Sequence, residues 1–241
     1  MNTIEVNKTV GELVREQPNR ARVFETLGID YCCGGKKLLE DVCSSKGLNA
    51  DDVLAQLQAI DSAEIEPTDV DADAMALDAL ANHIVETHHA YLKRELPRLN
   101  QMVQKVNRVH GEKDARLASV EQILYAFSRE LDLHMMKEEQ MLFPAITTLS
   151  NSDHAPSFMF GSIANPIRMM EMEHDSAGDG LEQMRKLTDD FTPPDWACNT
   201  YRALIDGLAR LEADMHQHVH KENNVLFPKA IELEGKLQGA R

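Results

Sequence analysis

Apolar residues recur every three or four positions along most of the chain, which is the period of an amphipathic helix. The longest segments with this pattern come after residue 73, and there are four of them: 74–109, 114–147, one that begins near 165, and 192–232. The third opens on Asn165 and Pro166, a helix cap followed by proline at the first helical position. No segment shows the two-residue alternation of a strand, so the sequence predicts an all-α fold.

The first 60 residues show shorter helical patterns, interrupted by Pro18 and by Gly34 and Gly35. The stretch 61–73 is acidic, contains proline and lacks apolar periodicity. We therefore expect three parts: a small helical domain with a cysteine pair at 1–60, a linker at 61–73, and a four-helix up-and-down bundle at 74–241.

Composition narrows the classes of partner. The chain carries 40 acidic and 25 basic residues, a formal net charge of −15, which argues against binding to nucleic acid or to an anionic membrane. No run approaches the roughly 18 apolar residues of a membrane helix, and the start lacks the basic and apolar regions of a secretory signal. These features predict a soluble, cytoplasmic protein.

One motif occurs twice at a fixed interval. His134 and Glu138 are followed by Leu-Phe-Pro, and 84 residues later His218 and Glu222 are followed by Leu-Phe-Pro again. Residues four apart lie on one face of a helix, so each motif directs an imidazole and a carboxylate toward the same point in a bundle. The repeat predicts two halves of a metal site.

The remaining ligands should come from the other two long helices. Glu171-Met-Glu-His174 offers His174, and one interval earlier the chain has His88 and His89. We choose His89, which lies 85 residues before His174, but periodicity alone does not separate it from His88 or His83. The predicted ligands are His89, His134, Glu138, His174, His218 and Glu222.

Other candidates fit the repeat less well. His216 and His220 are also four apart, but one repeat earlier their positions hold Asp132 and Met136, so we place them outside the site. Glu139 and Glu171 we expect around the site rather than on the metal, with Glu171 orienting a group next to a ligand.

Four imidazoles and two carboxylates favour a borderline metal over structural zinc, which generally takes thiolates or a closed tetrahedral set. We expect two iron ions bridged by the glutamates, with manganese as the second choice. Six ligands shared by two ions leave coordination positions for water, oxygen or nitric oxide. Only two imidazoles per ion also suit a site that releases iron.

The four cysteines do not form a disulfide framework, because Cys32 and Cys33 are adjacent and cannot join distant segments as a pair. Thiolates are soft ligands for ferrous iron, and the following Gly34 and Gly35 allow backbone amides to point at the sulfurs and activate them. The pair therefore predicts a metal-transferring or disulfide-exchanging site.

Three segments resemble the hemerythrin-like domain of the RIC (repair of iron centres, YtfE/ScdA) family: His134-Met-Met-Lys-Glu138-Glu-Gln-Met-Leu-Phe-Pro144, Glu173-His174-Asp175, and 218–228. The segment Gly28-Ile-Asp-Tyr-Cys32-Cys33-Gly-Gly35 is similar to that family's small N-terminal domain. The resemblance implies a non-haem di-iron protein, induced by nitrosative or oxidative stress, that supplies iron to damaged iron–sulfur clusters. The family's ligands match the same six residues, and its functional cysteines match Cys32 and Cys33.

Two other functions compete with iron donation: reduction of nitric oxide or peroxide at an open di-iron site, and reversible binding or sensing of oxygen or nitric oxide. A plain carrier has little need of the Cys32–Cys33 domain, so the cysteine pair favours repair or redox work. The expected partners are damaged iron–sulfur proteins. We also expect a homodimer, because a short helical domain on an acidic linker needs a partner surface.

Overall fold

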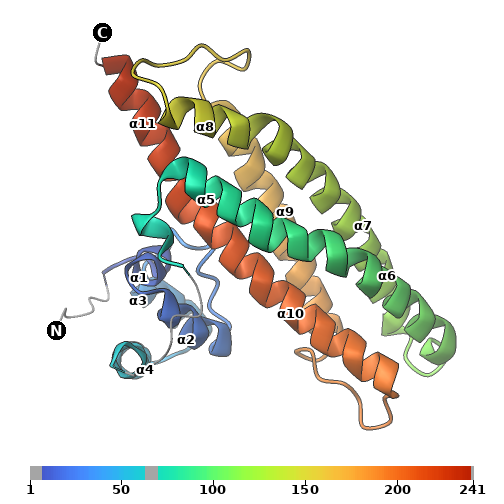
Figure 1. Cartoon of the computed structure of the whole chain (residues 1–241). Coiled ribbons are helices and arrows are strands. Elements are labelled where there is room, and N and C mark those ends of the chain that lie inside the picture. Colours follow the sequence, from blue (N-terminus) through green and yellow to red (C-terminus); the bar gives the residue numbers. More distant parts are fainter. Residues whose placement is uncertain (1–6, 63–69, 240–241) are drawn as a thin grey trace.

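The computed structural model describes residues 7–62 and 70–239, and in this part of the chain all regular structure is helical (Figure 1). The all-α prediction is confirmed. The bundle helices follow one another as α5 (Leu77–Ile84), η3 (Val85–His89), α6 (Ala90–His110), α7 (Arg116–Lys137), η4 (Glu138–Leu142), α8 (Phe143–Ser150), α9 (Ala164–Leu187), α10 (Asn199–Lys221), η5 (Glu222–Leu226) and α11 (Phe227–Gly239).

These elements form four rods in an up-and-down bundle (Figure 1). Helix α6 packs on α7, α7 packs on α9, and α10 closes the ring by packing on α9 and α6. The fourth rod starts at Asn199, not at 192 as expected from the apolar pattern. The reason is local, because Pro193 and Pro194 disfavour the helical conformation in the residues before them, and the helix begins only after Cys198, whose backbone is extended.

Three turns inside the rods are π-helical: η3, η4 and η5. Two of them have a cause in the repeated Leu-Phe-Pro. Proline has no N–H and its ring clashes with the carbonyl four residues earlier, which belongs to Gln140 for Pro144 and to Asn224 for Pro228. Both carbonyls lie within the wide turns that precede the prolines. Turns of this kind recur at functional sites in helices.

The bundle core consists of two apolar clusters. One lies between α6, α7, α9 and α10, and includes Leu99, Leu124 and Leu208; the other lies between α5, α8, α11 and the start of α9, and includes Ile146. On each rod, the predicted metal ligands lie at the boundary between the two clusters. We call this polar section the ligand layer.

The small domain has a core of its own. It contains α1 (Val10–Glu16), η1 (Pro18–Arg20), α2 (Ala21–Thr26), α3 (Leu39–Lys46) and α4 (Ala50–Asp61). Buried Arg20 ties the end of α4 to η1, with Nη2 placed 2.6 Å from Oδ2 of Asp61. Most of the predicted linker, 63–69, lies outside the described residues, so the domain limits stay predictions.

The small domain docks beside α10 and η5 (Figure 1). Gly11 and Gly35 allow the close approach, because a Cβ atom on either residue would lie 2.6 Å from Oδ1 of Asn224. Asn224 also donates a hydrogen bond to the carbonyl oxygen of Cys32 at 3.2 Å. The docking therefore brings the cysteine loop to the side of the ligand layer. None of the described helices is long and apolar enough to cross a membrane.

Candidate metal centre

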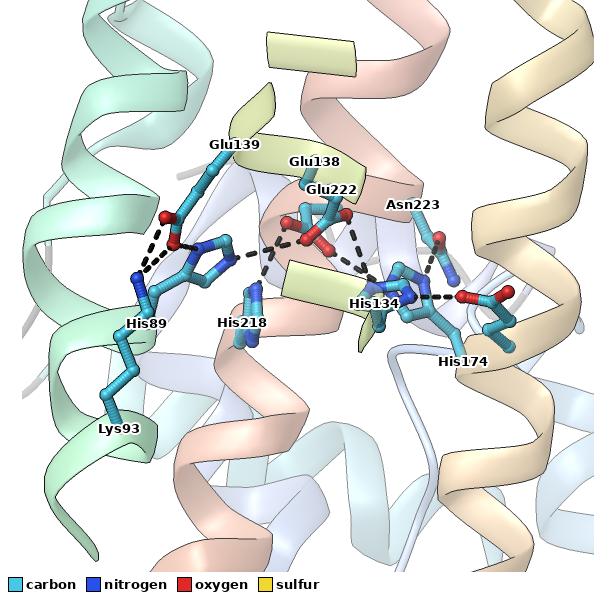
Figure 2. Close-up of polar contacts among 10 residues, drawn as sticks. His89, Lys93, His134, Glu138, Glu139, His174, His218, Glu222 and Asn223 are labelled. Carbon is cyan, nitrogen blue, oxygen red and sulfur yellow. Dashed lines mark hydrogen bonds and ion pairs between the residues drawn. The ribbon is translucent and has the colours of Figure 1, made fainter. Parts of the chain in front are cut away.

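The structure brings all six predicted ligands together in the ligand layer (Figure 2). They form two overlapping groups that share Glu138 and Glu222, one completed by His89 and His218 and the other by His134 and His174. Within each group the candidate ligand atoms lie within 4.8 Å of one another. Each of the six side chains is at most 2% exposed, so the groups face one another inside the protein.

Both glutamates connect the two groups. One oxygen of Glu138 lies 3.3 Å from Nε2 of His89 and the other lies 3.3 Å from Nε2 of His134. Glu222 does the same at 3.1 Å to His218 and 3.1 Å to His174. A carboxylate placed in this way can bridge two metal ions.

The donor set fits a cation. Both oxygens of Glu138 are buried and have no hydrogen bond from any residue in 7–62 or 70–239. A buried carboxylate without such bonds is costly unless positive charge compensates it.

The rings of His134 and His174 point their Nε2 atoms at each other, 3.0 Å apart. Their Nδ1 atoms are both committed as donors, 2.8 Å from Oε2 of Glu173 and 2.8 Å from Oδ1 of Asn223. The space between the two Nε2 atoms therefore takes a single proton or a metal ion. Both Nε2 atoms would be available to hold the same metal ion.

The local field also favours positive charge. Burial disfavours protonated His134, but Glu138, Glu173 and Glu222 outweigh burial and raise the pKa of this imidazole to about 10. Burial alone would raise the pKa of Glu222, but His218 and His174 hold that pKa well below its usual range. Burial lowers the pKa of His218. Both glutamates are thus anionic, and cations are attracted to the layer.

Outer residues hold the ligand rings in place. Nδ1 of His89 lies 2.8 Å from Oε1 of Glu139, which also accepts hydrogen bonds from Lys93 (Figure 2). Such a partner fixes the ring orientation and increases the basicity of the nitrogen that faces the metal. Glu139 thus lies around the site, as the sequence predicts.

The phenylalanines of the repeated Leu-Phe-Pro have matching roles. Phe143 stacks on His89 with ring centroids 5.8 Å apart, and Phe227 stacks on His174 at 6.1 Å. The π-helical turn between Glu138 and Phe143, and its counterpart in the other repeat, rotate each phenylalanine into position for this stacking.

The structure distinguishes the competing histidines. His88 is as buried as His89 but belongs to neither ligand group, and its ring atoms contact Asp214 and Lys221 instead. His220 also lies outside the groups; it is buried against the ring of Tyr31 in the small domain, at a centroid distance of 5.5 Å.

Glu171 lies outside both ligand groups, as expected. Its Oε1 lies 2.9 Å from Nζ of Lys36 in the small domain, and within 7–62 and 70–239 it makes no hydrogen bond to a ligand ring. Glu173 orients His134 instead, and Lys137 contacts the same carboxylate. The signal was hard to find in the sequence, because Glu173 precedes His174 but acts on a histidine of the neighbouring rod α7.

Cys32 and Cys33 lie next to the ligand layer, and the sulfur of Cys33 contacts the backbone of a ligand residue. Sγ of Cys33 is 3.4 Å from the carbonyl oxygen of His174, and a Cβ atom on Gly178 would be 3.6 Å from the same sulfur. The two sulfurs are 3.9 Å apart and both thiols are free. Both cysteines and His174 line a groove of about 1020 Å³ between the small domain, α9 and α10.

The expected activation of the thiols by backbone amides is wrong for Cys32. The amides of Cys32 and Gly34 donate to the carboxylate of Asp30, at 2.9 and 2.7 Å, and so do not face the sulfur. Contact with Cys33, burial and the nearby Asp30 raise the pKa of the Cys32 thiol well above its usual value. In the docked arrangement Cys32 is therefore a protonated thiol.

Comparison with known proteins agrees with this geometry. Residues 80–230 match the hemerythrin HHE cation-binding domain, and 6–61 match a domain of unknown function, DUF542, also called ScdA_N. The family match and the ligand geometry together make the bundle a metal-binding domain.

Full-length relatives match as well. The chain is 38% identical over 225 residues to the iron–sulfur cluster repair protein YtfE of Enterobacter sp. (strain 638), covering 93% of this chain and 97% of that one. The proteins of the same name from Pectobacterium atrosepticum and Yersinia pseudotuberculosis are 37% and 38% identical, with the same coverage. With both domains matched in order, the chain belongs to the RIC family of hemerythrin-like proteins.

Proposed function

We propose that the six side chains of the ligand layer hold two iron ions and that the protein supplies iron to damaged iron–sulfur clusters. The observation that carries this proposal is the pair of overlapping ligand groups that share two buried carboxylates. The names of the relatives support the repair role. Nitrogen and oxygen ligands without a thiolate favour iron over structural zinc.

The small number of imidazoles in the ligand set suits the release of iron from this site. Each ion would be held by only two imidazoles, together with the two carboxylates that both ligand groups share. Bound iron supplies Lewis-acid and redox chemistry in this layer. The chain's own part is to exclude water, orient the imidazoles and keep both glutamates anionic.

Cys32 and Cys33 are the proposed acceptors of an outgoing ion. Cys33 lies beside the backbone of His174, and the groove at this point is lined by residues of both domains. A rearrangement of the loop 30–34 that moves the carboxylate of Asp30 away from Cys32 would free the backbone amides now bonded to it, and these could then stabilise a thiolate. The damaged cluster protein would approach along the same groove.

A reconstitution experiment tests the donor function. The protein is loaded anaerobically with ferrous iron and mixed with a dehydratase whose cluster has been damaged by nitric oxide, and recovered activity and nitric oxide consumption are followed together. We expect recovery with loaded protein and none after chelation. Recovery that persists without metal removes the donor function, and turnover of nitric oxide without recovery favours a reductase.

Two pairs of variants locate the function in the chain. Glu222→Ala should retain less than half of the iron and lose repair, whereas His154→Ala, at an exposed position, should keep both. Cys33→Ser should keep the iron and lose repair, whereas Cys198→Ser, at an exposed cysteine outside the groove, should change neither. Equal iron in Glu222→Ala and His154→Ala would reject the ligand assignment.

A further inference from the structure

The two repeats place the same ligands in the layer but surround them differently. Glu139, which orients His89, has Asn223 as its counterpart 84 residues later, and Asn223 orients His174. Both residues accept a hydrogen bond from Nδ1 of the ligand ring, so this pair of positions keeps its role. The other pair does not.

Glu173 orients His134, and 85 residues earlier, the interval that separates His174 from His89, the chain has His88. The lysine next to each of these is repeated too: Lys137 contacts Glu173, and Lys221, 84 residues later, lies 2.9 Å from Nε2 of His88. His88 therefore stands where the repeat calls for an acceptor to His218.

His88 does not act as that acceptor, because both of its nitrogens are engaged elsewhere. Lysine can only donate, so Nε2 accepts from Lys221; Nδ1 then carries the proton and donates to Oδ1 of Asp214 at 2.9 Å. Held in this way, the ring lies parallel to that of His218, with a centroid distance of 5.2 Å and an interplanar angle of 1°.

On its Nδ1 side, the ring of His218 is therefore oriented by a stack and not by a hydrogen bond. Its Nδ1 atom is buried and has no hydrogen-bond partner in the described part of the chain, whereas His89, His134 and His174 each have one (Figure 2). Loss of such a partner typically lowers metal affinity by about 10- to 100-fold. The stack fixes the ring plane but adds nothing to the basicity of the nitrogen that faces the metal.

We propose that His88 is a positioning residue that makes the two metal positions unequal, so that the ion held by His89 and His218 is bound more weakly and leaves first. This inference rests on the proposed function, since it assigns the donated ion to one of the two ligand groups. It also gives the buried contacts of His88 with Asp214 and Lys221 a role, namely to keep the ring stacked and unavailable to Nδ1 of His218.

The test is an anaerobic titration of metal-free protein with ferrous iron against a chromophoric chelator, together with the rates at which a chelator in excess removes each ion. We expect the wild type to bind two ions in steps at least about tenfold apart. His88→Glu places a carboxylate beside Lys221, as Glu173 lies beside Lys137. It should strengthen the weaker step by about tenfold, slow the first release, and leave the stronger step unchanged.

A reciprocal change gives an independent reading. Glu173→His removes the acceptor from Nδ1 of His134, which leaves this ring in the situation of His218. The stronger step should weaken by about 10- to 100-fold, so that the two steps become similar. Two equal steps in the wild type, or a weaker step that responds to Glu173→His and not to His88→Glu, would overturn the inference. Binding of fewer than two ions by the wild type would instead reject the proposed di-iron site, so the two failures are distinguishable.

Discussion

The apolar half of the bundle and the ligand layer are built from the same four rods but are stabilised in opposite ways. Between α6, α7, α9 and α10, side chains such as Leu99 and Leu208 are fully removed from water and pack without polar partners. In the ligand layer the rods bury four imidazoles and two carboxylates, whose charges are costly to desolvate. The apolar half stabilises the fold, whereas the ligand layer needs a bound cation to compensate its buried carboxylates.

The largest effect should come from the apolar half. Leu99→Ala removes a buried side chain packed on Gly207 and should lower the free energy of unfolding by about 2–5 kcal/mol, whether or not metal is bound. Chemical denaturation of both forms measures it. A loss seen only in the metal-loaded form would mean that the two regions are not independent.

Metal removal should act on the ligand layer alone. At a free metal concentration about a thousandfold above the dissociation constant, bound metal adds about 4 kcal/mol to the free energy of unfolding, and chelation removes it. Leu99→Ala should keep this increment and Glu222→Ala should lose it. Thermal melts with and without chelator measure the difference; an unchanged melting temperature in the wild type would contradict a metal-dependent layer.

The pH dependence of metal binding sharpens the comparison further. In metal-free protein the pKa of His134 is about 10, so the ring holds a proton at neutral pH that a metal must displace. Affinity should therefore rise by about tenfold per pH unit for each displaced proton, and level off as the pH passes through this pKa.

The same proton contributes to folding with the opposite sign. A raised folded-state pKa stabilises metal-free protein fully below the unfolded value of about 6.5, and this contribution is lost as pH rises toward 10. The protons that are released when metal binds are counted by titration calorimetry of metal binding in buffers of different ionisation enthalpy. Binding without proton release would contradict the charge state assigned to His134.

The smallest effect is expected at the boundary between the two regions. Phe227→Leu keeps an apolar side chain but removes the stack on His174, and should cost about 0.5–1.5 kcal/mol in unfolding free energy. Iron stoichiometry should not change, because Asn223 still orients the ring. A loss of iron in this variant would show that the stack, and not the hydrogen bond, sets the ring.

Much of this arrangement could be predicted from the sequence, because it depends on spacing within single helices. The repeat separates His218 from its neighbours His216 and His220, and its interval points to the pair His88 and His89 as counterparts of His174. Helical periodicity also gave the four rods, apart from the start of α10.

Contacts between helices could not be predicted in the same way. Glu173 on α9 orients His134 on the neighbouring rod α7, and the spacing of residues along the chain does not predict that contact. The preference for His89 over His88 rested on one residue of spacing, and both proved to be buried. Asp30 precedes the cysteine pair in the sequence, but its capture of the amides depends on the fold of the loop.

The π-helical turns have a consequence for how the chain tolerates insertions and deletions. A turn of this kind contains one residue more than the α-helical turn it replaces. Deleting one residue from η4 could therefore be absorbed by converting it to an α-helical turn, whereas winding all of its present residues as α-helix would rotate everything after them by about 100°. Phe143 would then swing off the imidazole of His89, and α8 would present a different face to α5 and α11. The one extra residue in η4 thus determines which side chains after it face the neighbouring helices.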